Sequence, residues 1–387
     1  MREWKYRSYQ KVKMKEVVAI LLAWFFSMGC NVVLAESSYV SVADLPNQVE
    51  KGWHASYNIN GDTLNLDIDI IVPIVDKVPI IRISQYIPTD HKEFQGVEIT
   101  GNEIGRFVAE KAPDPMDSPS RDIGQNIQTI QLAALYDNEP YAEDNLLTFG
   151  EVKALANSLV VQFGFDDCDF DFDRPYDLSW THGYGLLVGR LQKENKEDGA
   201  GRYTGEPYSE KGFYFIAARQ RLHGVSIWTD IRSVYKSVRA EAIPDIGMAN
   251  VSLDSSDGGY SIGIKAAYED EMLCEDIPLC PFEKVKAAYE AEIIQGHIQQ
   301  ADQLVFAYVY FRDSNQNYVC YPCWILRCQY TKDPIKNANS KSNLAWQDTE
   351  SATMLVVNAQ TGELIDPYDK GKHRDRLPEF LTWEEVR

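Results

Sequence analysis

The chain has 387 residues, 44% of them hydrophobic and 25% charged, and its formal net charge at pH 7 is −20. That length allows two domains of ordinary size, each with its own hydrophobic core. The excess of acidic residues argues against nucleic acid as a partner, because a surface that binds phosphate groups needs a basic face. The acidity fits the solubility of an exported protein, and it leaves calcium or a basic partner open.

The first 35 residues are typical of an export signal. Six basic residues come first, an apolar run follows at residues 17–26, and the small residues Ser27 and Gly29 precede Cys30. Basic, apolar and small residues in this order make up a signal peptide. The piece that starts at Met14 is compact, which favours a true start there.

Three ways of processing this signal stay open. Ser27-Met28-Gly29-Cys30 resembles a lipobox and predicts a lipid on Cys30, whereas residues 33–35 resemble an ordinary cleavage site. Residues 17–35 are long enough to stay as an uncleaved anchor. Each predicts a protein at the outer face of the cytoplasmic membrane or secreted, and we favour lipid attachment at Cys30.

The remaining 352 residues carry 32 basic against 56 acidic side chains, a net charge near −24. We expect three parts after the signal at 1–35. Residues 36–145 form a β-rich segment with one helix, residues 146–270 a first helix-plus-sheet unit, and residues 271–387 a second.

A hairpin opens the β-rich segment. Its arms are residues 54–58 and 63–71, and Asn60-Gly61 between them suits the positive φ angles of a tight turn. The second arm alternates apolar and polar residues, which predicts a half-buried strand.

The rest of that segment is predicted to contain three further elements. A strand follows at residues 80–86, a proline-rich loop at 111–120 and a helix at 123–136.

Two amphipathic helices are predicted, one in each later unit. Thr148 and Glu151 form a capping box at the start of the first, and Gly164 ends it. The second begins with Pro281 at its first helical position and ends before Gly296. Both helices contain Phe-x-x-Val-Lys-Ala, which indicates either a duplication or a chance likeness between amphipathic helices.

Strands are expected after each helix. Those after the first are residues 166–173, 212–217 and a hairpin at 257–259; those after the second are residues 304–311, 318–330 and 354–365, the last folded at 360–362. The predicted fold class is therefore α+β, with two helix-on-antiparallel-sheet halves after the signal.

Six cysteines remain after Cys30: Cys168, Cys274, Cys280, Cys320, Cys323 and Cys328. An even number outside the cell permits disulfides, and Cys274 with Cys280 is the favoured local pair. Cys320 and Cys323 form a C-x-x-C motif, but on a strand they point to opposite faces and no helix start follows them. We therefore expect a disulfide or buried thiols there, and not redox or zinc chemistry.

Carboxylates occur at nearly every second position of residues 166–177, as in a calcium loop. Arg174 and Trp180 stand where an EF-hand needs Gly and Glu, so an EF-hand is rejected and a strand with one apolar face is favoured. The six histidines are scattered, and no hydrolase, nucleotide or dinucleotide motif occurs. No catalytic, cofactor-binding or metal-binding residue is predicted.

Two segments resemble a known family. DIDIIVP at residues 67–73 with DKVP at 76–79 resembles the opening of a domain of unknown function in exported lipoproteins of Gram-positive anaerobes. MLVVNAQTGELID at 354–366 resembles the closing hairpin of that family and, more loosely, of PepSY-type extracytoplasmic domains. The family implies an exported, lipid-anchored α+β protein with no assigned activity. PepSY-like domains imply binding or restraint of partner proteins.

These observations lead to one favoured hypothesis and one alternative. The favoured hypothesis is a non-enzymatic binding or regulatory module, tethered through its N-terminus, whose partner is a cell-envelope protein or peptide. The alternative is a secreted hydrolase that uses carboxylate catalysis.

Overall fold

A computed structural model describes the chain in thirteen stretches of residues. These are residues 39–59, 61–86, 98–101, 107–111, 127–132, 147–172, 186–191, 213–230, 246–254, 260–315, 317–331, 351–365 and 378–386. The chain divides into two units, Met1–Tyr39 and Val40–Arg387. The predicted signal, Cys30 and the loop predicted at 111–120, except for Lys111, lie outside the described residues. Within the described residues no helix is long and apolar enough to cross a membrane.

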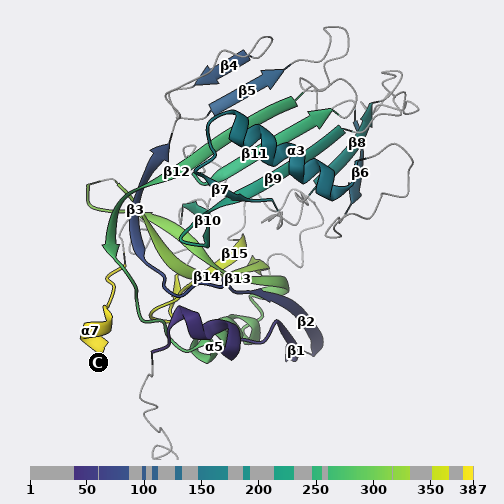
Figure 1. Ribbon diagram of the computed structural model, residues 1–387. Helices are drawn as coiled ribbons and strands as arrows, with labels where there is room; N and C mark the ends of the chain where they lie inside the picture. The colour runs from purple at the N-terminus through teal and green to yellow at the C-terminus, as the bar shows by residue number, and fades with distance from the viewer. Residues whose placement is uncertain are drawn as a thin grey trace, which may run out of the picture. The chain divides into compact units, whose positions relative to one another are not determined.

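Short helices and many strands make up the second unit (Figure 1). The helical elements are η1 (Val42–Asp44), α2 (Leu45–Gln48), α3 (Phe149–Gln162), α5 (Phe282–Ile294) and α7 (Trp383–Val386). The strands are β1 (Gly52–Ile59), β2 (Asp62–Ile71), β3 (Ile80–Tyr86), β4 (Glu98–Gly101), β5 (Phe107–Lys111), β6 (Ile127–Leu132), β7 (Asp169–Asp171), β8 (Leu186–Leu191), β9 (Phe213–Leu222), β10 (Val225–Asp230), β11 (Met248–Asp254), β12 (Tyr260–Cys274), β13 (Ile298–Arg312), β14 (Tyr318–Thr331), β15 (Ser351–Asn358) and β16 (Leu364–Ile365).

All sixteen strands of the described residues belong to one hydrogen-bonded network. The prediction of a mixed fold is confirmed, but the molecule is mostly sheet and not two helix-on-sheet halves. The prediction of purely antiparallel sheets is wrong, because β13 pairs in parallel with both β2 and β10. Strands of the N-terminal segment also contribute, since β2 pairs with β13 and β3 pairs with β12 and β14.

Seven of these strands form a closed ring of pairings. Starting from β9, the order is β10, β13, β14, β3, β12 and β11, and β11 pairs again with β9. Tyrosines from β13 bind backbone groups of other segments: Tyr308 Oη donates to Pro79 O at 2.9 Å, and Tyr310 Oη accepts from Ile246 N at 3.1 Å. The ring is thus tied together by side chains as well as by strand pairing.

The long strand β12 joins two parts of the ring because it changes neighbours along its length. Met248 on β11 pairs with Lys265, and Tyr86 on β3 pairs with the next residue, Ala266. At this point the buried Gln220 side chain of β9 binds Ala267, with Nε2 donating to O at 2.9 Å and Oε1 accepting from N at 2.6 Å. A glutamine amide therefore pairs with the backbone where β12 passes from one neighbour to the other.

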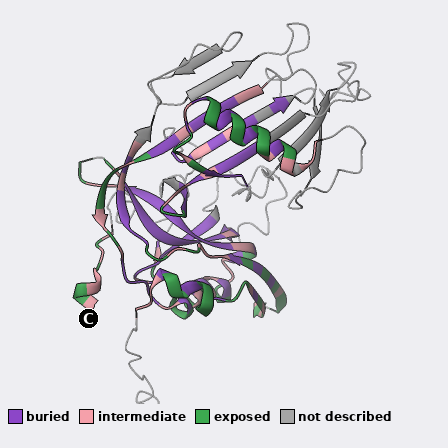
Figure 2. Ribbon diagram, viewed as in Figure 1, coloured by how far each residue is buried: buried purple, intermediate pink, exposed green. Residues whose placement is uncertain are grey.

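Two hydrophobic clusters lie against the helices. The buried face of α3 contains Val152, Ala156, Leu159 and Val160 and packs on residues of β9, β11 and β12. Figure 2 shows exposed residues on both longer helices, whereas the central strands are largely buried. The two longer helices therefore each cover part of the sheet with one apolar face.

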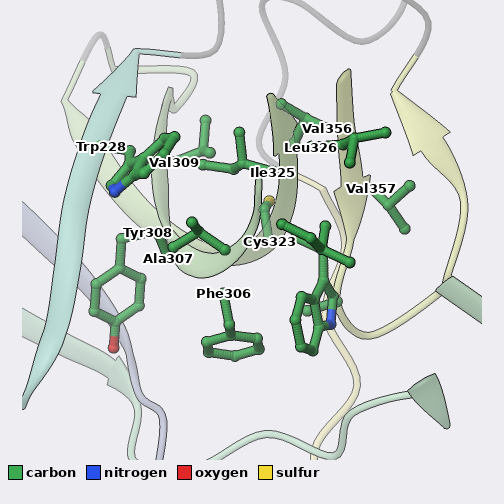
Figure 3. Close-up of a cluster of buried hydrophobic side chains, with 14 of the residues drawn as sticks. Trp228, Phe306, Ala307, Tyr308, Val309, Cys323, Ile325, Leu326, Val356 and Val357 are labelled. Atoms are coloured by element: carbon green, nitrogen blue, oxygen red, sulfur yellow. The ribbon is translucent and has the colours of Figure 1, made fainter. Parts of the chain in front are cut away.

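The second cluster is larger and centres on β13, β14 and β15. Figure 3 shows Trp228 of β10, Phe306 of β13 and Cys323 of β14 among its side chains. Tyr289 of α5 reaches into this cluster, where its hydroxyl donates to Trp324 O at 2.8 Å. Both faces of β14 are buried, which is why its sequence reads as a nearly continuous apolar run.

Several local predictions are confirmed. The first hairpin forms as β1 and β2, and Gly61 has a φ of 95°. Thr148 and Glu151 make both bonds of the capping box of α3, and the C-terminal hairpin turns through Gly362. In α5 the predicted apolar face is buried, but Pro281 is the N-cap and not the first helical residue.

The helix predicted at residues 123–136 is wrong. Residues Ile127–Leu132 form β6, which pairs in antiparallel register with β8 from Leu186 to Leu191. Isoleucine and threonine favour strands, and the pairing partner lies more than fifty residues away, so local periodicity misled the prediction. The strand predicted at 166–173 is shorter, Asp169–Asp171.

We predict that Gln220→Leu destabilises the protein by about 2–4 kcal/mol, because it removes two buried hydrogen bonds and leaves both backbone groups of Ala267 unpaired. Urea denaturation measures the change. Gln295→Leu is the control, since the amide of Gln295 binds Ala291 O at an exposed position; it should cost less than about 0.5 kcal/mol. Equal costs for the two variants would contradict the role of Gln220.

Candidate functional site

Two of the carboxylates considered for calcium, Asp169 and Asp171, are engaged with an arginine. Arg221 of β9 binds Asp169 through Nε at 2.8 Å and Nη2 at 2.7 Å, and its Nη1 lies 3.3 Å from Asp171 Oδ2. Asp166 and Asp167 come just before Asp169 in the chain, and the acids at 173–177 lie outside the described residues. Within the described part of the chain, no group of three or more His, Cys, Asp or Glu is placed to hold a metal ion.

All six cysteines after Cys30 are free thiols in the structure. The favoured pair, Cys274 with Cys280, is not bonded: Cys274 Sγ donates to Asp276 O at 3.3 Å, and Cys280 is buried. Burial raises the pKa of Cys280 to about 11 and holds the pKa of Cys320 and Cys323 far above the usual range. A high pKa removes the thiolate that redox or zinc chemistry needs.

A small polar cluster lies where α5 leads into β13. Glu292 Oε2 is 2.7 Å from His297 Nδ1 and accepts the hydroxyl hydrogen of Tyr330 at 3.1 Å. The rings of His297 and Tyr330 are in edge contact, with centroids 5.7 Å apart. A carboxylate that binds one ring nitrogen orients the imidazole, as general acid or base catalysis requires.

The C-terminal residues 378–386 dock through a glutamine of the β15–β16 turn. Gln360 Oε1 accepts from Leu381 N at 2.7 Å, and Gln360 Nε2 donates to Leu381 O at 2.8 Å. The same Nε2 donates to Pro278 O at 3.1 Å, and Tyr321 Oη donates to Oε1 at 3.3 Å. The buried Gln360 side chain therefore pairs with both backbone groups of Leu381, as a neighbouring strand would.

The turn that carries Gln360 is held tightly. Asn358 Oδ1 accepts from Gln360 N at 2.8 Å and from Thr361 N at 3.0 Å. Gly362 has a φ of +70°, and a Cβ there would lie 3.1 Å from Cys280 Sγ, so a larger residue would be strained and crowded. The amide is thus presented in one orientation.

A second contact recognises a side chain of the docked segment. Asp276 Oδ2 accepts from the indole Nε1 of Trp383 at 2.7 Å, while Asp276 Oδ1 accepts from Val78 N at 3.0 Å. Phe380 packs half-buried against the larger hydrophobic cluster. The site therefore binds three groups of the segment: the backbone of Leu381, the indole of Trp383 and the ring of Phe380.

The docked segment also has a local cap. Thr382 N and Oγ1 both donate to Glu385 Oε2, at 2.7 and 3.0 Å, and the hydrogen bond from the Thr382 backbone lowers the pKa of Glu385. This is one half of a capping box at the start of α7, in which the carboxylate of Glu385 accepts from the backbone N–H of Thr382. It turns the chain after Leu381 and places Trp383 beside Asp276.

The sequence alone does not point to this site. Gln360 was recognised only as a turn residue, and its partner Leu381 lies 21 positions further along the chain. The sequence carries no local signal for such a pairing. The one residue predicted to have a functional role, Cys30, lies outside the described residues.

Comparisons with known proteins assign this chain to no family. No protein-family model matches the chain, and no curated protein matches it. Among solved structures, it is similar to an uncharacterised protein from Eubacterium rectale ATCC 33656, with a TM-score of 0.47 and 11% identity over 83% of this chain and 97% of that chain. A likeness at this level carries no information about a site.

We predict that iodoacetamide at pH 8 modifies Cys280 at least about tenfold more slowly in the folded protein than in urea, because burial and a pKa of about 11 leave little thiolate. After unfolding without reductant, all six thiols should be alkylated. Mass spectrometry of the peptides measures both. Resistance of Cys274 and Cys280 to alkylation after unfolding would show that they form a disulfide and would contradict the structure.

We predict that Gln360→Glu raises the amide hydrogen exchange of Leu381 at least about tenfold. The carboxylate still accepts from Leu381 N but cannot donate to Leu381 O and Pro278 O, and each lost bond costs about 0.5–1.5 kcal/mol. Exchange at Val309 on β13 serves as the internal control and should not change. Unchanged exchange at Leu381 would show that Gln360 does not hold the segment.

Proposed function

We propose that this protein is exported, is held at the outer face of the cytoplasmic membrane by a lipid on Cys30, and acts as a non-enzymatic module that binds a cell-envelope protein or peptide. The observation that carries the binding role is the Gln360 site, where one amide side chain binds both backbone groups of Leu381 in the C-terminal segment. Backbone recognition of this kind is how proteins take up a peptide as an added strand.

Three features of the sequence support the export part of the proposal. The basic, apolar and small residues before Cys30 follow the order of a signal peptide, and Ser27-Met28-Gly29-Cys30 resembles a lipobox. The segments at 67–79 and 354–366 resemble exported lipoproteins of unknown function, the latter also PepSY-type domains. The acidic composition suits a protein that faces the medium.

We also propose that residues 146–270 and 271–387 are related units that share one sheet. The Val of the repeated Phe-x-x-Val-Lys-Ala is Val152 in α3 and Val285 in α5, and both side chains are fully buried. Each helix packs on its own hydrophobic cluster. Equivalent burial at equivalent positions supports a duplication.

A secreted hydrolase with carboxylate catalysis is the second candidate. Glu292 favours it, because this mostly buried carboxylate binds both His297 and Tyr330. The observation is weaker than that for binding, since the same bonds also join the end of α5 to β14.

We predict that Cys30→Ser abolishes lipid attachment, so that the protein either is released into the medium after cleavage at a later site or accumulates as the precursor. Fractionation of cells with mass measurement of the product distinguishes processed from unprocessed chains. Met28→Leu leaves the cysteine in place and is the matched control. A mature chain of unchanged mass that stays on the membrane without Cys30 would contradict lipidation.

For the hydrolase candidate, the purified unit that begins at Val40 is incubated with panels of glycans, peptides and esters. The binding proposal predicts no turnover by the wild type beyond that of Glu292→Gln. Turnover that Glu292→Gln lowers at least about hundredfold, with folding intact by circular dichroism, would overturn it in favour of the hydrolase.

A further inference from the structure

Within the part of the chain that the structure describes, the docked C-terminal segment is held by a few contacts that all come from one short stretch. They are the two backbone bonds of Leu381 to Gln360, the bond from the Trp383 indole to Asp276 and the packing of Phe380. Leu381 itself remains 39% exposed. Because each such bond contributes only about 0.5–1.5 kcal/mol net, the segment can leave its site without unfolding the sheet.

We propose that the site formed by Gln360, Pro278 and Asp276 accepts residues 378–386 of a second copy of this chain, so that two copies exchange their C-terminal segments. The proposal goes beyond the binding role above and does not depend on it. A second copy presents the same Leu381 backbone, the same indole and the same Phe380, so every contact of the docked segment is reproduced between the two chains. Exchange of identical elements is a low-cost route to a dimer, since no contact is lost.

The chain length between site and segment permits this exchange. Twelve residues, 366–377, connect Ile365 at the end of β16 to the segment. When extended they span at most about 40 Å, which is enough to reach a site on a neighbouring molecule.

The length of this connection, residues 366–377, also determines the protein concentration at which exchange occurs. A short tether gives the chain's own segment an effective concentration on the order of millimolar at its own site. The monomer with its own segment docked therefore dominates in dilute solution, and exchange needs either a high local concentration of copies or a defect in the closed form.

Two variants of the unit that begins at Val40 remove this competition. The site variant, Gln360→Glu, keeps an intact segment but weakens the site. The segment variant, Leu381→Pro with Trp383→Phe, keeps an intact site but lacks the backbone N–H and the indole N–H that bind it. Each alone should be monomeric at about 100 μM by size-exclusion chromatography with light scattering.

Mixed in equal amounts, the two variants should form a 1:1 dimer, because the segment of the first docks in the site of the second. Different mass tags on the two chains identify the heterodimer. A mixture whose mass distribution equals that of the separate variants overturns the proposal.

A second measurement does not require the Gln360→Glu variant to fold. The segment variant is titrated with a synthetic peptide of residues 376–387, and binding is followed by calorimetry. Saturable binding that weakens at least about fivefold when the peptide carries Trp383→Phe supports the proposal. Failure of the unmodified peptide to bind a segment variant that is folded by circular dichroism overturns it.

Discussion

The pairing of Gln220 with Ala267 is the constraint on which the rest of this fold depends. A strand that leaves one neighbour for another exposes backbone groups at the junction, and a buried N–H or C=O without a partner costs about 1–3 kcal/mol. At Ala267 the glutamine amide supplies one acceptor and one donor in the positions that a neighbouring strand would use. The strand β12 can therefore pair with β11 along its first part and with β3 along its second, and the ring of strands closes.

The backbone beside this junction is paired as well. Gly247 N donates to Lys265 O at 2.6 Å, and Gln220 N donates to Gly247 O at 2.9 Å, so both backbone groups of Gly247 are paired beside this junction. Gly247 has a φ of 80°, and a Cβ there would lie 2.9 Å from Ile227 Cβ. At this junction Gly247 permits the close approach of Ile227, and the Gln220 side chain binds the backbone groups that a neighbouring strand would otherwise bind.

The chain uses the same pairing a second time at its C-terminus. Gln360 binds Leu381 with the same two bonds that Gln220 makes to Ala267. The difference lies in the partner: Ala267 is in the middle of a paired strand, whereas Leu381 belongs to a short segment near the end of the chain. The same pair of bonds is therefore fixed at Ala267 and exchangeable at Leu381. Leu381 can move away without breaking strand pairing, whereas Ala267 cannot.

The sequence by itself determined the features that depend on neighbouring residues. The capping box of Thr148 and Glu151, the Asn60-Gly61 turn and the buried face of α5 all follow from interactions within a few positions of the chain. The tertiary structure alone decided that residues 127–132 are a strand, that β13 pairs in parallel with β2, and that Gln220 and Gln360 pair with backbone. The physical reason is that the residues next to a glutamine or an isoleucine in the sequence do not indicate a partner that lies 21, 47 or more positions away. Such pairings form only when folding brings the unsatisfied groups together.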